Sequence, residues 1–487
     1  MSYNKVQKLN NGFATLELLI AFVILVIVLT TVITFIFSSQ SISVDSQTNN
    51  EALYKAKQYL EEARALGRKN FFALADIGAI SEDIYTKTLK VNWTDDYVKE
   101  ITSRIAWNTE LQRPQQVELT TMIASRENAL RGDTCDPQLS ADEWKNPQVL
   151  GYVDFPSNEG ATDMDTRLKK VYLTTNPSAA AKPDLYIIDV SKPTNPKIIG
   201  EINTGNGLEA VKVIKYDGSL CETCKGKIYA YVANRSINAQ LQIIDVTDPQ
   251  NISLVANFKI PNVTGTGYGK SIFYKDGFIY LGLYKTTGLE FNIIDVSNPL
   301  SPQYVAGWEL NATVNDIIVK DNNIAYLAIT QPNPPTDKKN FIILDISNPA
   351  NIQEIASFSP QTTLTQSGNS LFLDGDTLYL GRTDGANCSN CHELYVLDVS
   401  NPSSILVKGS KKIDSTITAM TLRENYLFMM TDAANEGFQI WDVSDPLNIT
   451  KYVGKNIAQK STGAFDCEGN LMYVGQESNR ALQIIGP

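Results

Sequence analysis

Two thiols and an imidazole in the C-terminal half are spaced in a way that could support covalent or redox chemistry. The segment Cys388–His392, with the sequence CSNCH, has the spacing of a c-type haem attachment motif, and it holds the only histidine of the chain. The neighbouring residues are polar and turn-forming, which suits an exposed loop in an oxidising compartment. We therefore expect a Cys388–Cys391 disulfide and an accessible His392, with covalent haem as the alternative cofactor.

The other four cysteines offer no obvious catalytic group. Cys221 and Cys224 repeat the two-residue spacing without a histidine. Two such pairs could form a four-cysteine zinc site. The two pairs, however, fall in different repeats and at opposite ends of the predicted strands, so they cannot meet. We expect a local Cys221–Cys224 disulfide, with independent metal binding as the alternative. Cys135 and Cys467 both fall near one end of the last repeat, which favours a disulfide between them.

A third group with potential chemistry stands at the N-terminus. Glu17 is the one carboxylate at the head of the apolar run 18–37. A charge at mid-membrane costs roughly 2.5–3.5 kcal/mol, and less near the edge, so it needs a partner. Cleavage between Gly12 and Phe13 would create an α-amine of the right sign. Because Glu17 cannot easily reach its own terminus, the partner would be a neighbouring chain in a filament.

This pattern resembles the N-terminus of type IV pilins and pseudopilins. The leader 1–12 is short and basic, Gly12 stands at the cleavage position, Phe13 would be the new first residue, and Glu17 follows four residues later. The resemblance implies that a prepilin peptidase removes the leader and methylates Phe13, and that Glu17 serves filament assembly with other pilin subunits. The alternatives are a plain signal anchor or a secretory signal, which would need a small-residue cleavage site after the apolar run.

The elements behind these residues divide the chain in two. Apolar residues at three- and four-residue spacing predict one helix over 13–66, with a transmembrane part at 18–37, or two helices with a break near 38–44. Period-two alternation then predicts three short antiparallel strands, a pilin-like β head over 67–125. The polar stretch 126–146 is interpreted as a linker.

The rest of the chain is an internal repeat. The unit LYIIDVSKP at 185–193 recurs with its aspartate at intervals of 44 to 56 residues, as Asp189, Asp245, Asp295, Asp345, Asp398 and Asp442. Such a period, with short β runs, is typical of a β-propeller, and the motif resembles the LVIVD-repeat propellers. We interpret the aspartates as turn formers. We expect 147–487 to form an all-β seven-bladed propeller whose last blade is closed by the N-terminal strand 148–155.

Together these features predict an α+β pilin stem followed by a propeller. The net charge of −11 and the lack of a basic stripe argue against nucleic-acid binding. We expect no enzyme but a minor type IV pilin that displays its propeller at or near a filament tip for binding or adhesion. Before assembly it would cross the inner or cytoplasmic membrane once, with its bulk outside; afterwards it would lie in the pilus or at the cell surface. Its surface ligand would bind the propeller face with the longer loops, 261–270, 330–340 and 383–393.

Two alternatives to this function remain. One is a membrane-anchored extracellular propeller enzyme or c-type haem electron carrier. Converging acid–base groups or a bound haem would favour it, and the stem would then serve only as a membrane anchor. The other is a type II secretion pseudopilin, which the N-terminus alone does not distinguish from a pilin.

Overall fold

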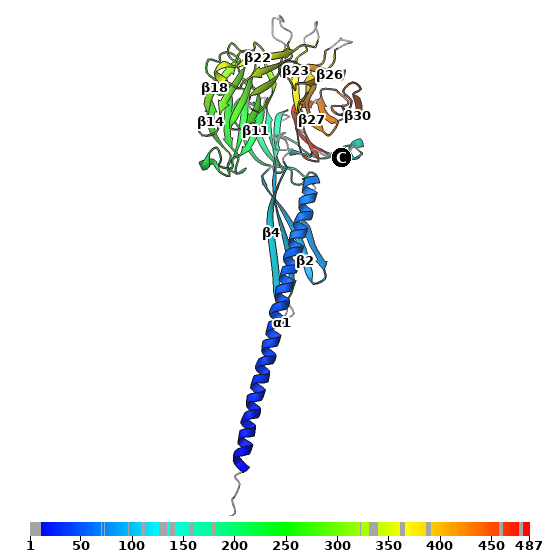
Figure 1. The fold of residues 1–487 in the computed structure, drawn as a ribbon. Helices are drawn as coiled ribbons and strands as arrows, with labels where there is room; N and C mark the ends of the chain where they lie inside the picture. Colours follow the sequence, from blue (N-terminus) through cyan, green and yellow to red (C-terminus); the bar gives the residue numbers. More distant parts are fainter. Residues whose placement is uncertain are drawn as a thin grey trace, which may run out of the picture. The chain divides into compact units, whose positions relative to one another are not determined.

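The computed structural model describes two units, Met1–Ser125 and Arg126–Pro487, which are treated separately below (Figure 1). Their described residues run from 11 to 487 with gaps, and the side chains of 11–18, 37–45, 69, 95 and 461–462 are also not described. The gaps are 70, 73, 96, 109–112, 126–133, 137–141, 156–159, 177–181, 322, 331–338, 361–365, 386–390, 457–460 and 477–480. The predicted leader therefore lies almost wholly outside the described residues.

The first unit is built on one continuous helix, α1 (Asn11–Lys69). Its 59 residues span about 90 Å at 1.5 Å per residue, and it is longer at both ends than the predicted helix 13–66. The window Leu19–Ile36 has a mean hydropathy of 3.1 and is exposed, so it is long and apolar enough to cross a membrane. The hydroxyl of Thr30 donates to the carbonyl of Val26 at 2.8 Å, which satisfies this polar group within the helix.

Gly67 does not end the helix, although glycine is common just after the C-terminus of a helix. The helix continues to Lys69, and a Cβ built on Gly67 would lie 2.6 Å from Cδ1 of Leu74. Gly67 is therefore a point of close packing, where the chain after the helix folds back against it.

A four-stranded antiparallel sheet packs on the upper part of α1, where three strands were predicted. Alanines 52, 56 and 63 of α1 are buried against Leu89, Ile101 and Ile105, the apolar face of the alternating strands. The additional strand is fully exposed along its length, so it lacks the alternation that identifies half-buried strands. In order across the sheet, the strands are β1 (Ile77–Glu82), β2 (Tyr85–Asp95), β3 (Val98–Asn108) and β4 (Pro114–Ala124).

Six antiparallel sheets, each made of four consecutive strands, make up most of the second unit, which is propeller-like. The first three sheets are β7 (Ala161–Arg167), β8 (Lys170–Thr175), β9 (Leu185–Asp189), β10 (Lys197–Ile202); β11 (Leu208–Lys215), β12 (Ile228–Asn234), β13 (Leu241–Asp245), β14 (Ser253–Phe258); and β15 (Gly269–Lys275), β16 (Phe278–Leu283), β17 (Phe291–Asp295), β18 (Gln303–Trp308).

The next three sheets are β19 (Val314–Lys320), β20 (Ile324–Ile329), β21 (Phe341–Asp345), β22 (Gln353–Phe358); β23 (Gly368–Asp374), β24 (Thr377–Arg382), β25 (Leu394–Asp398), β26 (Leu406–Lys411); and β27 (Ile417–Arg423), β28 (Tyr426–Thr431), β29 (Phe438–Asp442), β30 (Thr450–Lys455). Short 3-10 helices η2 (Glu222–Cys224) and η3 (Pro349–Asn351) lie in connections. The third strand of each of these six sheets is buried except at its final aspartate, because neighbouring sheets cover both of its faces.

The six repeat aspartates close turns, as their position predicts. The Oδ1 atom of each accepts a hydrogen bond from the main-chain N–H two residues later, at 2.8 to 3.0 Å. This Asx turn leads from the third strand toward the fourth. Each aspartate is the last residue of the third strand of a different sheet, so the six do not form a common site.

A last sheet combines both ends of the unit. It contains β31 (Ser461–Gly469), β32 (Leu471–Gln476) and β33 (Leu482–Gly486), and β6 (Gln148–Val153) pairs antiparallel with β33 at its outer side. Gly151 of β6 approaches the carbonyl of Pro193 in the first sheet, so that a Cβ there would lie 2.2 Å from the oxygen. Gly200 of the first sheet meets Pro249 of the second in the same way, also at 2.2 Å.

Part of the expected linker 126–146 is packed on this last sheet, which corrects that interpretation. β5 (Thr134–Cys135) pairs in parallel with β31, and the 3-10 helix η1 (Glu143–Lys145) carries Trp144. The indole of Trp144 is fully buried with Phe428, and its Nε1 donates to Oδ1 of Asn470 at 3.1 Å. The polar composition of 126–146 gave no sign that this large side chain would be buried.

Candidate functional site: a polar cavity among the inner strands

A cavity of about 460 Å³ lies among the first strands of the sheets in the second unit. These strands contact one another in the order β7, β11, β15, β19, β23, β27 and β31, and β31 contacts β7 again. All seven contribute to the lining, which is mostly hydroxyl, amide and charged side chains. A polar wall in the interior of a β domain is unusual enough to make this the candidate site.

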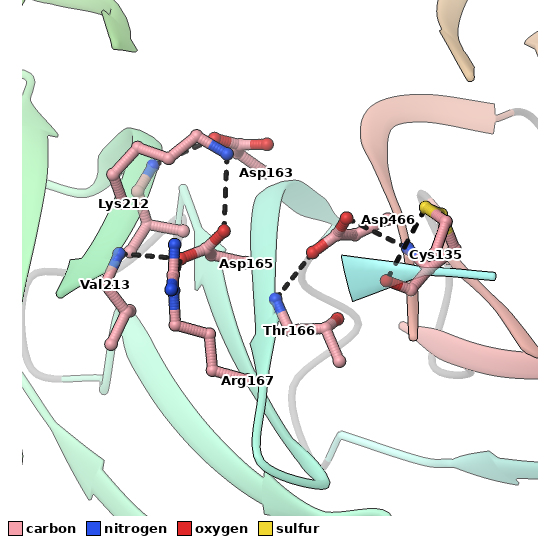
Figure 2. Close-up of polar contacts among 10 residues, drawn as sticks. Cys135, Asp163, Asp165, Thr166, Arg167, Lys212, Val213 and Asp466 are labelled. Atoms are coloured by element: carbon pink, nitrogen blue, oxygen red, sulfur yellow. Dashed lines mark hydrogen bonds and ion pairs between the residues drawn. A yellow bond between two sulfur atoms is a disulfide. The ribbon is translucent and has the colours of Figure 1, made fainter. Parts of the chain in front are cut away.

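An ion-pair cluster lies on one side of this region, between β7 and β11 (Figure 2). The Nζ atom of Lys212 lies 3.3 Å from Oδ1 of Asp165, and Nε of Arg167 donates to Oδ2 of Asp165 at 3.2 Å. The main-chain N–H of Val213 donates to the same Oδ2 at 2.7 Å. Burial alone would raise the pKa of Asp165, but the charges of Lys212 and Arg167 outweigh it and hold that pKa below its usual value.

Three further carboxylates have the opposite shift. Desolvation raises the pKa of Asp163 and of Asp466 to about 7 and that of Asp316 to about 6, although nearby lysines and main-chain hydrogen bonds partly oppose it. For Asp466, the negative charge of Asp165 adds to the effect of desolvation. These groups exchange protons near neutral pH, a property that is enriched at functional sites and also occurs in structural networks.

Each of these carboxylates also joins one sheet to the next. Oδ2 of Asp163 accepts from the N–H of Val211 at 2.9 Å, and Oδ2 of Asp316 accepts from that of Leu371 at 2.8 Å. Oδ2 of Asp466 accepts from the N–H of Thr166 at 2.6 Å (Figure 2). One oxygen of each group is thus fixed by a neighbouring strand, and this orients the carboxylate.

A second charged group borders the cavity between β11 and β15. The buried carboxylate of Glu209 contacts Arg235 through Oε1 at 3.2 Å and Lys270 through Oε2 at 3.0 Å. Both cations lie over the ring of Tyr284, at 5.9 and 5.5 Å from its centre. Burial lowers the pKa of Lys270, but the charge of Glu209 overcomes this and the net pKa is raised, so the ammonium stays charged.

The cysteines predicted as disulfides are paired in the structure, as far as they are described. Cys135 is bonded to Cys467 with a Cα–Cα distance of 5.1 Å, and Cys221 to Cys224 with one of 5.2 Å. Cys391 is disulfide-bonded and buried, while Cys388 lies outside the described residues. None of the five described cysteines lines the cavity.

The haem alternative does not fit this arrangement. Thioether attachment needs a free thiol, and that of Cys391 is already used in a disulfide. His392 is half-buried, not freely accessible as expected, and its Nδ1 forms a hydrogen bond with Oγ of Ser410 at 2.7 Å. Among the described residues, no group of three or more His, Cys, Asp or Glu side chains could hold a metal ion.

The structure does not test the remaining predicted residues. Gly12, Phe13 and Glu17 belong to α1 by their backbone, but their side chains are not described. The loops 330–340 and 383–393 of the expected binding face are only partly described. Sequence reasoning missed the cavity residues, although one signal was present: Asp163 and Asp165 place two carboxylates in the first strand of the first sheet, and Asp316 places one in that of the fourth.

One family model agrees with the propeller-like fold. The LVIVD repeat model matches residues 179–204, 225–259, 266–307, 336–359 and 390–412. A selenomethionine-substituted virginiamycin B lyase from Staphylococcus aureus is similar, with 14% identity and a TM-score of 0.48, over 70% of this chain and 99% of that one. A catalytically inactive form of that lyase with quinupristin has 14% identity and a TM-score of 0.47, over 70% of this chain and 100% of that one. No curated protein matches the sequence. The chain thus carries LVIVD repeats in a propeller-like unit behind an N-terminal apolar helix.

Proposed function

We propose that the protein is a minor type IV pilin that presents its repeat unit outside the cell, at or near a filament tip, to bind a surface or partner. The observation that carries the proposal is the Gly12-Phe13 pair with Glu17 four residues later, at the head of an apolar helix whose window Leu19–Ile36 is wholly exposed. This exposed window of eighteen residues, apolar except for three threonines, needs lipid or other apolar helices around it. A filament of such helices supplies both this cover and a partner charge for Glu17.

We further propose that the second unit is a seven-bladed propeller closed by β6. Three features support this: β6 pairs with β33, β31 contacts β7, and Gly151 meets Pro193 as Gly200 meets Pro249. Closure removes the open sheet edges that would otherwise invite pairing with other chains. A closed, rigid body of this kind is suited to carrying binding loops.

Mass spectrometry of the mature protein from its native host tests the pilin proposal. We expect a chain that begins at N-methylated Phe13, because the prepilin pattern places the cut after Gly12. The Glu17→Ala variant should still insert in the membrane but enter filaments less, while Glu51→Ala, further along the same helix, should assemble normally. A mature chain that begins at Met1, or beyond Phe37, would show that the helix is only an anchor or a signal.

A second candidate is an extracellular binding protein or enzyme that uses α1 only as an anchor. The observation in its favour is the polar cavity with carboxylates of raised pKa. It predicts cavity-dependent activity in a protein that is never incorporated into filaments. The processing and assembly experiments above therefore distinguish the two.

A further inference from the structure

We propose that the cavity among the inner strands binds a small organic cation with primary ammonium groups, which Asp163 and Asp316 receive. This inference concerns the second unit alone and does not rest on the filament proposal. It assigns a ligand class to a site whose residues otherwise tie the sheets together.

The cavity is large enough for such a ligand. Its volume of about 460 Å³ corresponds to roughly fifteen waters at ~30 Å³ each, and lies in the usual range of small-molecule pockets. Polar side chains such as Thr162, Asn315 and Asn369 line it alongside the charges. Asn315 and Asn369 each donate an amide N–H to a main-chain carbonyl of the next strand, at 2.7 and 2.8 Å, so their positions are fixed before any ligand enters.

The side chains that line the cavity carry more negative than positive groups, which favours a cation. Four carboxylates line the cavity (Asp163, Glu209, Asp316 and Asp432) against two ammonium groups, those of Lys212 and Lys270. Both ammonium groups are already held in ion pairs, Lys212 by Asp165 and Lys270 by Glu209. Within the described part of the chain, Asp163, Asp316 and Asp432 form no ion pair within 4.0 Å. Asp432 follows β28, whereas Asp163 and Asp316 lie on inner strands, so these two are the positions where we expect an added positive charge to gain most.

Their placement favours an extended cation over a metal ion. Asp163 lies on β7 of the first sheet and Asp316 on β19 of the fourth, so the two carboxylates approach the cavity from different sheets. A divalent metal ion needs several oxygens converging at about 2.0–2.6 Å. In each carboxylate Oδ2 accepts a main-chain N–H of the next sheet, and Oδ1 of Asp316 also accepts that of Ile317 at 2.8 Å. A carboxylate has about four acceptor sites, so each group keeps acceptor capacity for an ammonium.

The number of protons released when the cation binds is a signature of the proposed site that does not depend on the affinity. Desolvation raises the pKa of Asp163 to about 7 and that of Asp316 to about 6, so both are partly protonated near neutral pH. A bound cation would lower both pKa values and expel these protons. The binding enthalpy at pH 7 should therefore depend on the ionisation enthalpy of the buffer.

Isothermal titration of the full-length protein with 1,5-diaminopentane tests the proposal, with 1,5-pentanediol as the uncharged match. We expect the diamine to bind with proton release, the diol not to bind, and Asp163→Asn and Asp316→Asn each to weaken diamine binding by about tenfold or more. Asn keeps an acceptor for the main-chain N–H, and thermal melting checks that each variant is folded. The matched control is Asp345→Asn, in an exposed turn, which should bind like the parent.

Three results would overturn it: no diamine binding at millimolar concentration, equal binding of the diol, or full binding by both cavity variants. Calcium chloride provides the last arm. Tight calcium binding that Asp163→Asn and Asp316→Asn abolish would make the cavity a metal site and the proposal wrong.

Discussion

The junction between the last and first sheets of the second unit differs from the junction between its fourth and fifth sheets. At the former, Asp466 binds the N–H of Thr166 and the carboxylate of Glu468 binds the N–H of Lys169. The last sheet also holds the Cys135–Cys467 disulfide and the β6–β33 pairing, and Trp144 packs between it and the sixth sheet, against Phe428. The latter junction has Asp316 on the N–H of Leu371, Asn315 on the carbonyl of Gly368, the Lys320–Asp376 ion pair and the Arg382–Asn340 hydrogen bond, beside apolar packing.

This difference follows from chain connectivity. The fourth and fifth sheets are joined by a short connection, so little entropy is lost when they come together. The last and first sheets are brought together across more than 300 residues of sequence, and loop closure over that length costs more. The chain compensates with β6, a strand from its other end, and with a disulfide that ties the segment before β6 to the last sheet. The junction of the chain ends is therefore where changes should have the largest effects.

Removal of β6 should produce the largest effect. We compare fragments that begin at Pro147 and at Gly160, both of which lack Cys135 and Trp144. The shorter one loses the pairing with β33 and the stacking of Phe155 on Tyr186, whose rings are 4.2 Å apart. We expect it to lose at least about 4 kcal/mol of unfolding free energy, measured by urea denaturation. Equal midpoints for the two fragments would show that β6 does not hold this junction.

The second largest effect should be a difference between the two disulfides whose cysteines are both described. The Cys135–Cys467 bond closes a sequence separation of 332 residues and the Cys221–Cys224 bond only 3. Replacing the first pair by serines should cost about 2–5 kcal/mol, and replacing the second about 2 kcal/mol or less, because the stabilisation grows with loop length. Thermal melting of the two double variants measures this. A larger loss from the short-range pair would contradict the role assigned to the long-range one.

The dependence of stability on pH should be the smallest effect. Since Asp163, Asp316 and Asp466 have raised pKa values of about 7, 6 and 7, the folded state binds more protons than the unfolded chain between about pH 4 and 7. Their contribution to stability is lost as pH rises through this window, whereas Asp165, with its lowered pKa, acts in the opposite direction at acid pH. We expect melting a few degrees higher at pH 5 than at pH 8, and a flatter profile for Asp163→Asn. A melting temperature that rises steadily from pH 5 to 8 would contradict this balance.

Periodic features of the fold could be predicted from sequence. The repeat motif indicated the propeller-like unit and its six turn aspartates, and the apolar run indicated α1, because each rests on local pattern and spacing. The sequence Pro147–Val153 also indicated β6, through its likeness to an earlier outer strand.

Features that depend on tertiary position were missed. Strand β1 is exposed throughout and so has no pattern, and Trp144 is a single aromatic in a polar stretch. Lys99 is an ordinary residue of an alternating strand, yet its Nζ donates to the carbonyls of Phe71 and Leu74, both at 2.9 Å, and lies 4.3 Å from the Trp93 ring centre. The cavity depends on which residues of seven separate strands face one another, and no local pattern gives that.

The Cys135–Cys467 bond also determines how the chain transmits tension. A pull on the segment before Cys135 passes through the sulfur atoms directly to β31, close to the other end of the chain. The intervening 332 residues of sequence separation, about 1,100 Å of extended polypeptide at ~3.4 Å per residue, carry no load while the bond is intact. Traction between the two ends of the chain can therefore not unravel the six sheets that lie between these cysteines while the bond is intact.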